Sequence, residues 1–193
     1  MYILMSDATA TVRELVIRHP NLGVLIYPRD GSVAPKLGTV WAADTSSSFD
    51  DAVFLQMLKR IEDRGDCRFV TTPSVAGDHE ATLRIWSTWN TKIRNYGLTP
   101  AFVAQDGCLP DSLPWRDLGA VFISGTTRYR SGEAAAAIIC QGNRMNIWTH
   151  ICGVNTVKLA THAAALCARS IDGRSTAQFE WALRLSKQPP LGA

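Results

Sequence analysis

Short apolar runs that stop at a polar residue or a glycine recur along this chain, and a helix-like stretch follows most of them. Such runs end at Asp44, Ser74, Gly107, Gly125, Gly153 and Gly173. Apolar runs of this length, alternating with helices, are typical of buried parallel strands. The carboxyl ends of such strands meet at one mouth, where ligands bind. Asp44, Gln105 and Asp172, which lie at run ends far apart in the sequence, are therefore candidates for one site.

A single α/β domain over residues 1–193 is the architecture that this alternation predicts, because a chain of this length can bury one sizeable core. Seven runs qualify as strands, in the order GVLIYP, TVWAAD, CRFVTTP, TPAFVAQDG, GAVFISG, NIWTHICG and ARSIDG. A closed barrel needs eight strands, so a compact (β/α) barrel of the TIM type would have one strand that is missing, degenerate or hidden. An open, doubly wound sheet is the alternative.

Helices are expected between most of these strands. Asp50 and Asp78 are typical N-cap residues, and each precedes a segment with apolar residues at helical spacing. Asn155 or Thr156 would cap a helix over residues 158–167. Further helices are expected over residues 8–19, 133–140 and 178–185.

Composition narrows the classes of function. The net charge of +3 is compatible with a nucleic-acid partner but does not itself indicate one. No apolar run approaches the roughly 18 residues of a membrane span, so no membrane partner is expected. The five cysteines form no Cys-x-x-Cys pair, which predicts a reducing, cytoplasmic compartment. Dinucleotide and P-loop motifs are absent and no residues have zinc-ligand spacing, so we expect neither a cofactor nor a metal.

Paired carboxylates at strand ends suit displacement at the anomeric carbon of a sugar. One carboxylate of the pair Asp44 and Asp172 would stay ionised as the nucleophile, while the other, less well solvated, would transfer protons. The alternative is that Asp44 caps a turn and Asp172 forms an Asp-Gly turn. Gln105 and Asp106 have two interpretations as well. The glutamine amide offers a donor and an acceptor to a purine edge, or both residues form an ordinary turn before Gly107.

Five motifs, each at a strand end and in the same order, resemble those of the tRNA-guanine transglycosylase superfamily. The segment GVNTVKLATHAAALCARSIDG resembles its last βαβ unit, whose strand ends in a nucleophilic aspartate, and WAADTSSSF is similar to its Asp-Ser-Gly-Gly-Phe turn. FVAQDG and FISGTT resemble its Val-Gln-Gly strand end and its Gly-Gly loop, and TTPSVAGD is similar to a Pro-Asp-Val-Val-Gly-Asp turn of its short relatives. The likeness is closer to short phage and bacterial relatives, described as queuine tRNA-ribosyltransferase-like or DNA deazaguanine transglycosylases, and covers residues 22–175.

Base exchange on a nucleic acid is the activity that the resemblance implies. Guanine would leave the sugar and a free 7-deazaguanine would be installed, after the target nucleotide has left the stack. By matched position, Asp172 would be the nucleophile, and Asp44 would act as the acid/base group or position the base. Substrate would be bound by Ser74, Gln105, Asp106, Gly125, Thr126, Thr127, Arg128 and Asn155.

Several departures from the family pattern bear on the substrate. Ser74 stands where the family has a base-recognising aspartate, and a serine supplies neither a charge nor a bidentate contact. Arg128 and Arg130 replace a Glu and a Lys, which makes the mouth more basic and favours phosphate contact. The Cys-x-Cys-x-x-Cys zinc element of the tRNA enzymes is absent, so DNA is expected as the partner rather than tRNA.

Two other functions remain open on the same scaffold. One is a non-catalytic protein that binds a deazapurine, a nucleotide or DNA, and the other is a hydrolase that releases a modified base and installs nothing. A partner copy that closes an incomplete barrel would make the protein a homo-oligomer.

Overall fold

Eight parallel strands close into a barrel in the computed structural model, which describes residues 1–6, 10–28, 35–36, 38–45 and 49–173. Each strand pairs with the next in the sequence, and the last pairs with the first. The strands are β1 (Tyr2–Ser6), β2 (Leu22–Ile26), β3 (Val40–Ala43), β4 (Cys67–Thr71), β5 (Pro100–Ala104), β6 (Ala120–Ile123), β7 (Trp148–Ile151) and β8 (Ser170–Gly173).

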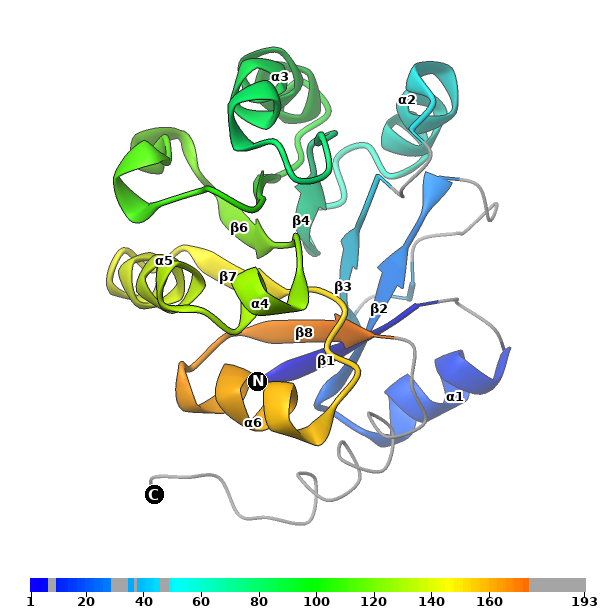
Figure 1. The fold of residues 1–193 in the computed structure, drawn as a ribbon. Coiled ribbons are helices and arrows are strands. Elements are labelled where there is room, and N and C mark those ends of the chain that lie inside the picture. The colour runs from blue at the N-terminus through cyan, green and yellow to red at the C-terminus, as the bar shows by residue number, and fades with distance from the viewer. Residues whose placement is uncertain (7–9, 29–34, 37, 46–48, 174–193) are drawn as a thin grey trace.

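Helices surround this ring of strands (Figure 1). They are α1 (Ala10–Arg18), α2 (Asp51–Arg60), α3 (His79–Arg94), α4 (Thr127–Arg130), α5 (Glu133–Arg144) and α6 (Val157–Ala165), with short 3-10 turns η2 (Pro110–Ser112) and η3 (Trp115–Asp117). Within the described residues, none of these helices combines the length and the apolar character that crossing a bilayer requires.

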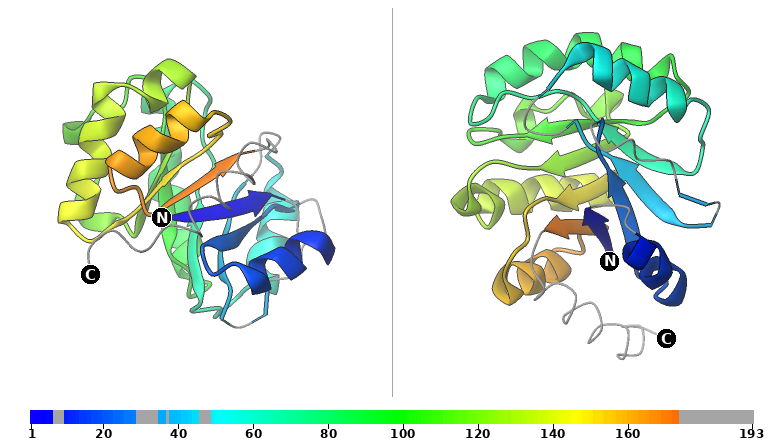
Figure 2. Two further views of the ribbon diagram at one scale, coloured as in Figure 1. Left: turned by 90° about the horizontal axis from the view of Figure 1, so that it is seen from below. Right: turned by 90° about the vertical axis from the view of Figure 1, so that its right-hand side faces the viewer.

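The eighth strand is β1, which the seven predicted strands did not include. It lies between β8 and β2, where Ile3 pairs with Ile171 on one side and with Leu22 on the other (Figure 2). Ile3 and Leu4 are each only 1% exposed, so this strand is a full part of the core. Of the three possibilities for the eighth strand, the hidden one is confirmed, because β1 is neither missing nor degenerate. The open-sheet alternative is excluded because the ring is closed.

Alternation along the strands separates two apolar layers. One layer contains Leu4, Leu25, Ala42, Phe69, Ala101, Val103, Ala120 and Phe122, which fill the barrel interior. The other packs the outer faces of the strands against helices and includes Phe54 of α2 and Trp86 of α3. Side chains along a strand alternate between its two faces. A residue two positions after the last inner residue of a strand therefore points to the same side and faces the mouth of the barrel.

The helix starts follow the capping predictions. The Asp50 carboxylate accepts a 3.0 Å hydrogen bond from the Val53 N–H, and Asp78 accepts one of 2.9 Å from the Ala81 N–H. Of the two residues proposed to cap α6, Thr156 is the N-cap. The helix expected over residues 178–185 falls outside the described residues.

Candidate active site

A cavity of about 610 Å³ opens at the carboxyl ends of the strands. Its lining includes all of the predicted site residues except Thr127 and Arg128: Asp44, Ser74, Gln105, Asp106, Gly125, Thr126, Asn155 and Asp172. They lie on β8 and on the segments that follow β3, β4, β5, β6 and β7. Closure of the barrel thus brings residues from both halves of the sequence around one space.

Asp172 faces this cavity from the inner side of β8 and is 7% exposed. Its Oδ1 accepts a 2.8 Å hydrogen bond from the Gly153 N–H and lies 3.4 Å from Nε2 of His150. Gly153 has φ +61°, and a Cβ at this position would overlap the Arg130 guanidinium. The positive φ favours a glycine at this position, where the N–H points at the carboxylate. The Asp-Gly turn interpretation is wrong, because Asp172 and Gly173 belong to a paired strand.

Asp44 follows β3 and is held by Thr71 of the neighbouring strand β4. The Thr71 hydroxyl donates a 2.6 Å hydrogen bond to Asp44 Oδ1 and accepts one of 2.9 Å from the Thr45 N–H. Burial raises the pKa of Asp44, the Thr71 hydrogen bond opposes this in part, and the negative charge of Asp172 adds to the rise. Asp44 therefore holds a proton more readily than an ordinary aspartate does, which suits a general acid.

Ser74 and Gln105, two of the predicted base-binding residues, contact each other. Gln105 Nε2 donates a 3.1 Å hydrogen bond to the Ser74 hydroxyl, and its Oε1 lies 3.4 Å from the backbone nitrogen of Gly77. Gln105 is only 2% exposed. Its amide plane is thus fixed at the cavity wall by the loop that follows β4.

Asp106 and Thr126 join the loops that follow β5 and β6. The Asp106 carboxylate accepts hydrogen bonds from the Thr126 N–H (2.7 Å) and the Thr126 hydroxyl (2.6 Å), and these lower the pKa of Asp106, the hydroxyl most strongly. Gly125 has φ +83°, and a Cβ there would overlap the Asp106 carboxylate. The carboxylate of Asp106 therefore organises the loop after β6.

Replacing Asp106 by alanine should lower the free energy of unfolding by about 1 kcal/mol at pH 7, because Thr126 loses its acceptor. The pKa of Asp106 is lowered in the folded state, so its contribution is present above the ordinary value of 3.8 and is lost as the pH falls through the lower folded-state pKa. Urea unfolding should therefore give a smaller difference from the wild type in strong acid. Asp111→Ala, at an exposed position, is the control. A difference that is the same at acid and neutral pH would contradict this role.

Thr127 and Arg128 were expected beside the base or the sugar-phosphate, but they do not line the cavity. The reason is local: α4 begins at Thr127 with Thr126 as its N-cap, and both side chains are exposed outside the cavity. Arg130, at the end of the same helix, reaches back instead. Its Nη2 donates a 3.1 Å hydrogen bond to the Thr127 hydroxyl, and its Nη1 lies 3.7 Å from the sulfur of Cys152. Arg130 thus places a cation beside the loop that binds Asp172.

His150 and Thr71 contact the two carboxylates and were not predicted as site residues. His150 was expected to be a core or mouth histidine; it is fully buried and touches Asp172. The sequence feature that could have identified His150 is its two-residue spacing from Cys152, which places both side chains on the same side of β7 and its extension. Aromatic side chains that line the cavity were also not predicted: Tyr27, Phe49 and Phe122. Among the described residues, no group of three or more His, Cys, Asp or Glu side chains is placed to hold a metal ion.

No family model and no curated protein matches this sequence. Several solved structures, however, are similar to this chain. The chain is similar to a native KDPGal structure, with a TM-score of 0.51 and 15% identity over 97% of this chain and 95% of that one. It is similar to an HpcH/HpaI aldolase from Desulfitobacterium hafniense DCB-2, with a TM-score of 0.50 and 11% identity over 100% of this chain and 95% of that one.

The fold is the TIM barrel. A third similar structure is a mandelate racemase/muconate lactonizing enzyme-like protein from Rubrobacter xylanophilus DSM 9941, with a TM-score of 0.54 and 10% identity. That match covers 89% of this chain, which spans just over half (56%) of the other protein. Identities this low establish a shared TIM barrel and nothing about the reaction. The resemblance to transglycosylases stays a prediction.

Proposed function

We propose that this protein exchanges a guanine-type base in DNA for a free 7-deazaguanine through a covalent glycosyl-aspartate. The observation that carries the proposal is the pair of carboxylates, Asp44 and Asp172, in one cavity, where the charge of Asp172 acts on Asp44. Retaining displacement at an anomeric carbon requires two carboxylates in unequal environments. The cavity volume of about 610 Å³ is in the range of small-molecule sites and suits a nucleotide that has left the stack.

The two carboxylates divide the chemistry. A carboxylate oxygen of Asp172 attacks C1′ of the sugar and forms a C–O bond, while the bond from C1′ to the base nitrogen breaks. Asp44 donates its proton to the departing guanine. In the second half, N9 of the incoming 7-deazaguanine attacks C1′, the bond to Asp172 breaks, and Asp44 takes up the N9 proton. The enzyme thus returns to its starting protonation state.

Recognition of the base is assigned to the part of the cavity wall formed by the segments after β4 and β5. The fixed amide of Gln105 offers polar atoms to a purine edge, with the Ser74 hydroxyl beside it. Tyr27, Phe49 and Phe122 supply flat apolar surface of the kind on which bases stack. Ser74 forms at most single hydrogen bonds, so base selection on this wall depends mainly on Gln105.

An exchange assay with radiolabelled guanine in an oligonucleotide tests this function. Without free 7-deazaguanine, we expect a covalent protein–DNA adduct and the release of at most one labelled guanine per enzyme molecule, because forming the adduct breaks the bond to guanine. With free 7-deazaguanine, the loss of label from single-stranded DNA should continue over many turnovers. Release of many guanines per enzyme molecule without added base would identify a base-releasing glycosidase instead. The same assay on tRNA decides between the two polymers.

A non-catalytic binding protein is the second candidate, and the contact between Ser74 and Gln105 favours it. The neutral Ser74 hydroxyl stands at the position where the resemblance would place a recognition aspartate. It already accepts one of the two N–H groups of the Gln105 amide. Calorimetry with free 7-deazaguanine and with single-stranded and duplex DNA separates the two candidates. Binding without label loss or adduct would support the binding protein and exclude base exchange.

Arg128 gives a test of the nucleic-acid partner. It is exposed on α4, two residues after Thr126, which lines the cavity. Arg128→Gln should weaken DNA binding similarly for all sequences and reduce the slope of log affinity against log salt by about 1, because one phosphate contact is lost. Arg84→Gln, on the exposed side of α3, is the matched control. An unchanged slope in Arg128→Gln would show that Arg128 does not contact a phosphate.

A further inference from the structure

Polar side chains form a continuous row inside the barrel, which is otherwise filled by apolar residues. Two of them, Trp148 and His150, alternate on the inner face of β7, and Ser170 and Asp172 alternate on the inner face of β8. The register of the two strands pairs His150 directly with Ser170. The row therefore runs from the amino end of the barrel to the cavity at its carboxyl end.

The hydrogen bonds of this row are sequential. Trp148 Nε1 donates to the Ser170 hydroxyl oxygen at 2.8 Å. The same oxygen lies 2.9 Å from Nδ1 of His150, and Nε2 of that ring lies 3.4 Å from Asp172 Oδ1. Ser170 and His150 are both completely buried, so bulk water does not reach them and their polar atoms depend on the groups around them.

Counting donors fixes the proton on His150. The indole of Trp148 can only donate, so the Ser170 oxygen is its acceptor. The Ser170 hydroxyl then has one hydrogen to place, and in the described part of the chain the acceptor within reach is His150 Nδ1. Leaving the hydrogen of a buried hydroxyl without an acceptor would destabilise the folded state by about 1 to 3 kcal/mol. Nδ1 is therefore the bare nitrogen, and Nε2 carries the hydrogen that points at Asp172.

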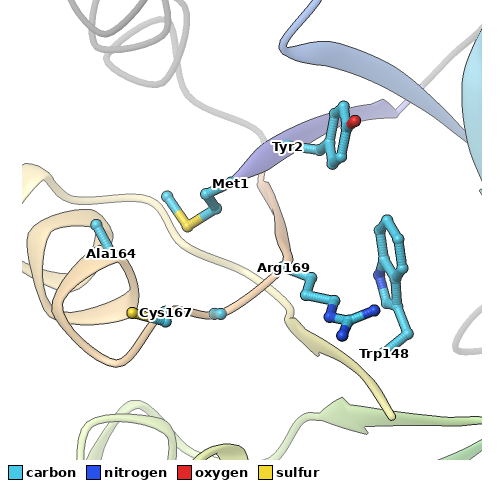
Figure 3. Close-up of a pocket in the computed structure, with 7 residues that line it drawn as sticks. Met1, Tyr2, Trp148, Ala164, Cys167 and Arg169 are labelled. Atoms are coloured by element: carbon cyan, nitrogen blue, oxygen red, sulfur yellow. The ribbon is translucent and has the colours of Figure 1, made fainter. Parts of the chain in front are cut away.

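Packing fixes the orientation of the two rings in this row, those of Trp148 and His150. The His150 ring stacks on Phe122, with centroids 4.6 Å apart, and is tilted against Phe69 at 5.4 Å. The Trp148 indole stacks on Tyr2 at 5.9 Å, and Arg68 and Arg169 have their guanidinium carbons 5.5 and 5.8 Å from its ring centroid. Figure 3 shows Trp148 at this end of the barrel, with Arg169 and Tyr2 around it.

We infer that Trp148, Ser170 and His150 form a positioning relay, which holds the His150 Nε2–H toward Asp172 Oδ1 and so orients the nucleophile. This role rests on the proposed base exchange. The Gly153 N–H and the His150 N–H both donate to Oδ1, so they fix the carboxylate plane. His150 is then a donor to the nucleophile and does not take up substrate protons, which leaves that task to Asp44.

The tautomer can be measured on the wild-type chain without any assay of activity. Nitrogen-15 NMR of histidine-labelled protein distinguishes a protonated ring nitrogen from a bare one, and His150→Gln identifies the signal among the four histidines. We expect Nε2–H alone at neutral pH, and a mixture of tautomers in Ser170→Ala. Nδ1–H, or a ring protonated on both nitrogens, in the wild type would overturn the relay.

Kinetics test the positioning role. Ser170→Ala should slow adduct formation at saturating DNA by about 10- to 100-fold with little change in the half-saturating DNA concentration, because orientation and not binding is lost. Ser170→Thr keeps the hydroxyl and should restore the rate, and Ser87→Ala on α3 is the control. Wild-type rates in Ser170→Ala would refute the role. If the wild type forms no adduct, base exchange fails, and the tautomer measurement still decides the relay.

Discussion

Replacing Asp172 by asparagine should abolish the covalent adduct with guanine-containing DNA and slow base exchange by a factor of about 10⁴ to 10⁶. An amide oxygen is too weak a nucleophile to form the bond to C1′, and loss of a nucleophile costs rates of this order. The substitution is nearly isosteric, and the asparagine carbonyl can still accept the hydrogen bond from the Gly153 N–H. The fold should therefore survive, so the loss of rate reports on the chemistry.

Intact-mass spectrometry of protein incubated with the oligonucleotide measures the adduct, and label release measures exchange. Asp63→Asn is the matched control, because it makes the same change at an exposed turn between α2 and β4, at the other end of the barrel. Asp63 has φ +56°, a conformation that asparagine tolerates. Wild-type exchange by Asp172→Asn would contradict the mechanism. An adduct that persists and maps to Asp44 would reverse the roles of the two carboxylates.

Strand ends were predictable from the sequence because an apolar run and its terminating residue are local. The period of two then determines which terminating side chains face inward, so Asp44 and Asp172 meet in one cavity as expected. Strand β1 escaped this logic. YILMS is as long as the other strands and also ends in a polar residue, but it becomes a buried strand only through its pairing with β8 and β2, which are distant from each other in the sequence.

Side-chain partners were much less predictable. The hydrogen bonds from Gln105 to Ser74 and from Thr126 to Asp106 cross between different strand-end loops, so no spacing within one segment reveals them. Thr127 and Arg128 were placed in the site because their motif contains Gly125, but the helix that begins at Thr127 takes them out of the cavity lining.

His150 illustrates the same limit. Alternation with Cys152 placed it on the inner face of its strand, but whether an inward histidine packs in the core or joins the site depends on the strand beside it. The register of β7 with β8 decides the matter, because it sets His150 opposite Ser170 and one inward position below Asp172. Register is a property of two strands together and is not encoded in either one alone.

Asp44→Asn should slow exchange by about 10²- to 10⁴-fold, the usual contribution of a general acid–base group. It should also make the protein more stable at pH 7, by about 1 kcal/mol, as is common where a functional group is removed from an active site. The asparagine carbonyl can still accept the Thr71 hydrogen bond. What disappears is a carboxylate that is partly buried and lies within range of the charge of Asp172, both of which raise the pKa of Asp44.

The pH dependence of that gain follows from the sign of the shift. Because the pKa of Asp44 is raised on folding, the folded state holds the proton more tightly, and the wild type loses stability as the pH rises from 3.8 through the folded-state pKa. Below 3.8 the carboxyl is neutral in both states, so the advantage of Asp44→Asn should vanish there, grow as the pH rises and be complete above the folded-state pKa. Urea unfolding at several pH values measures this, with Asp63→Asn as the control. A variant that is less stable than the wild type at pH 7 would mean that the Asp44 carboxylate is fully compensated by its partners and has no reason to act as an acid.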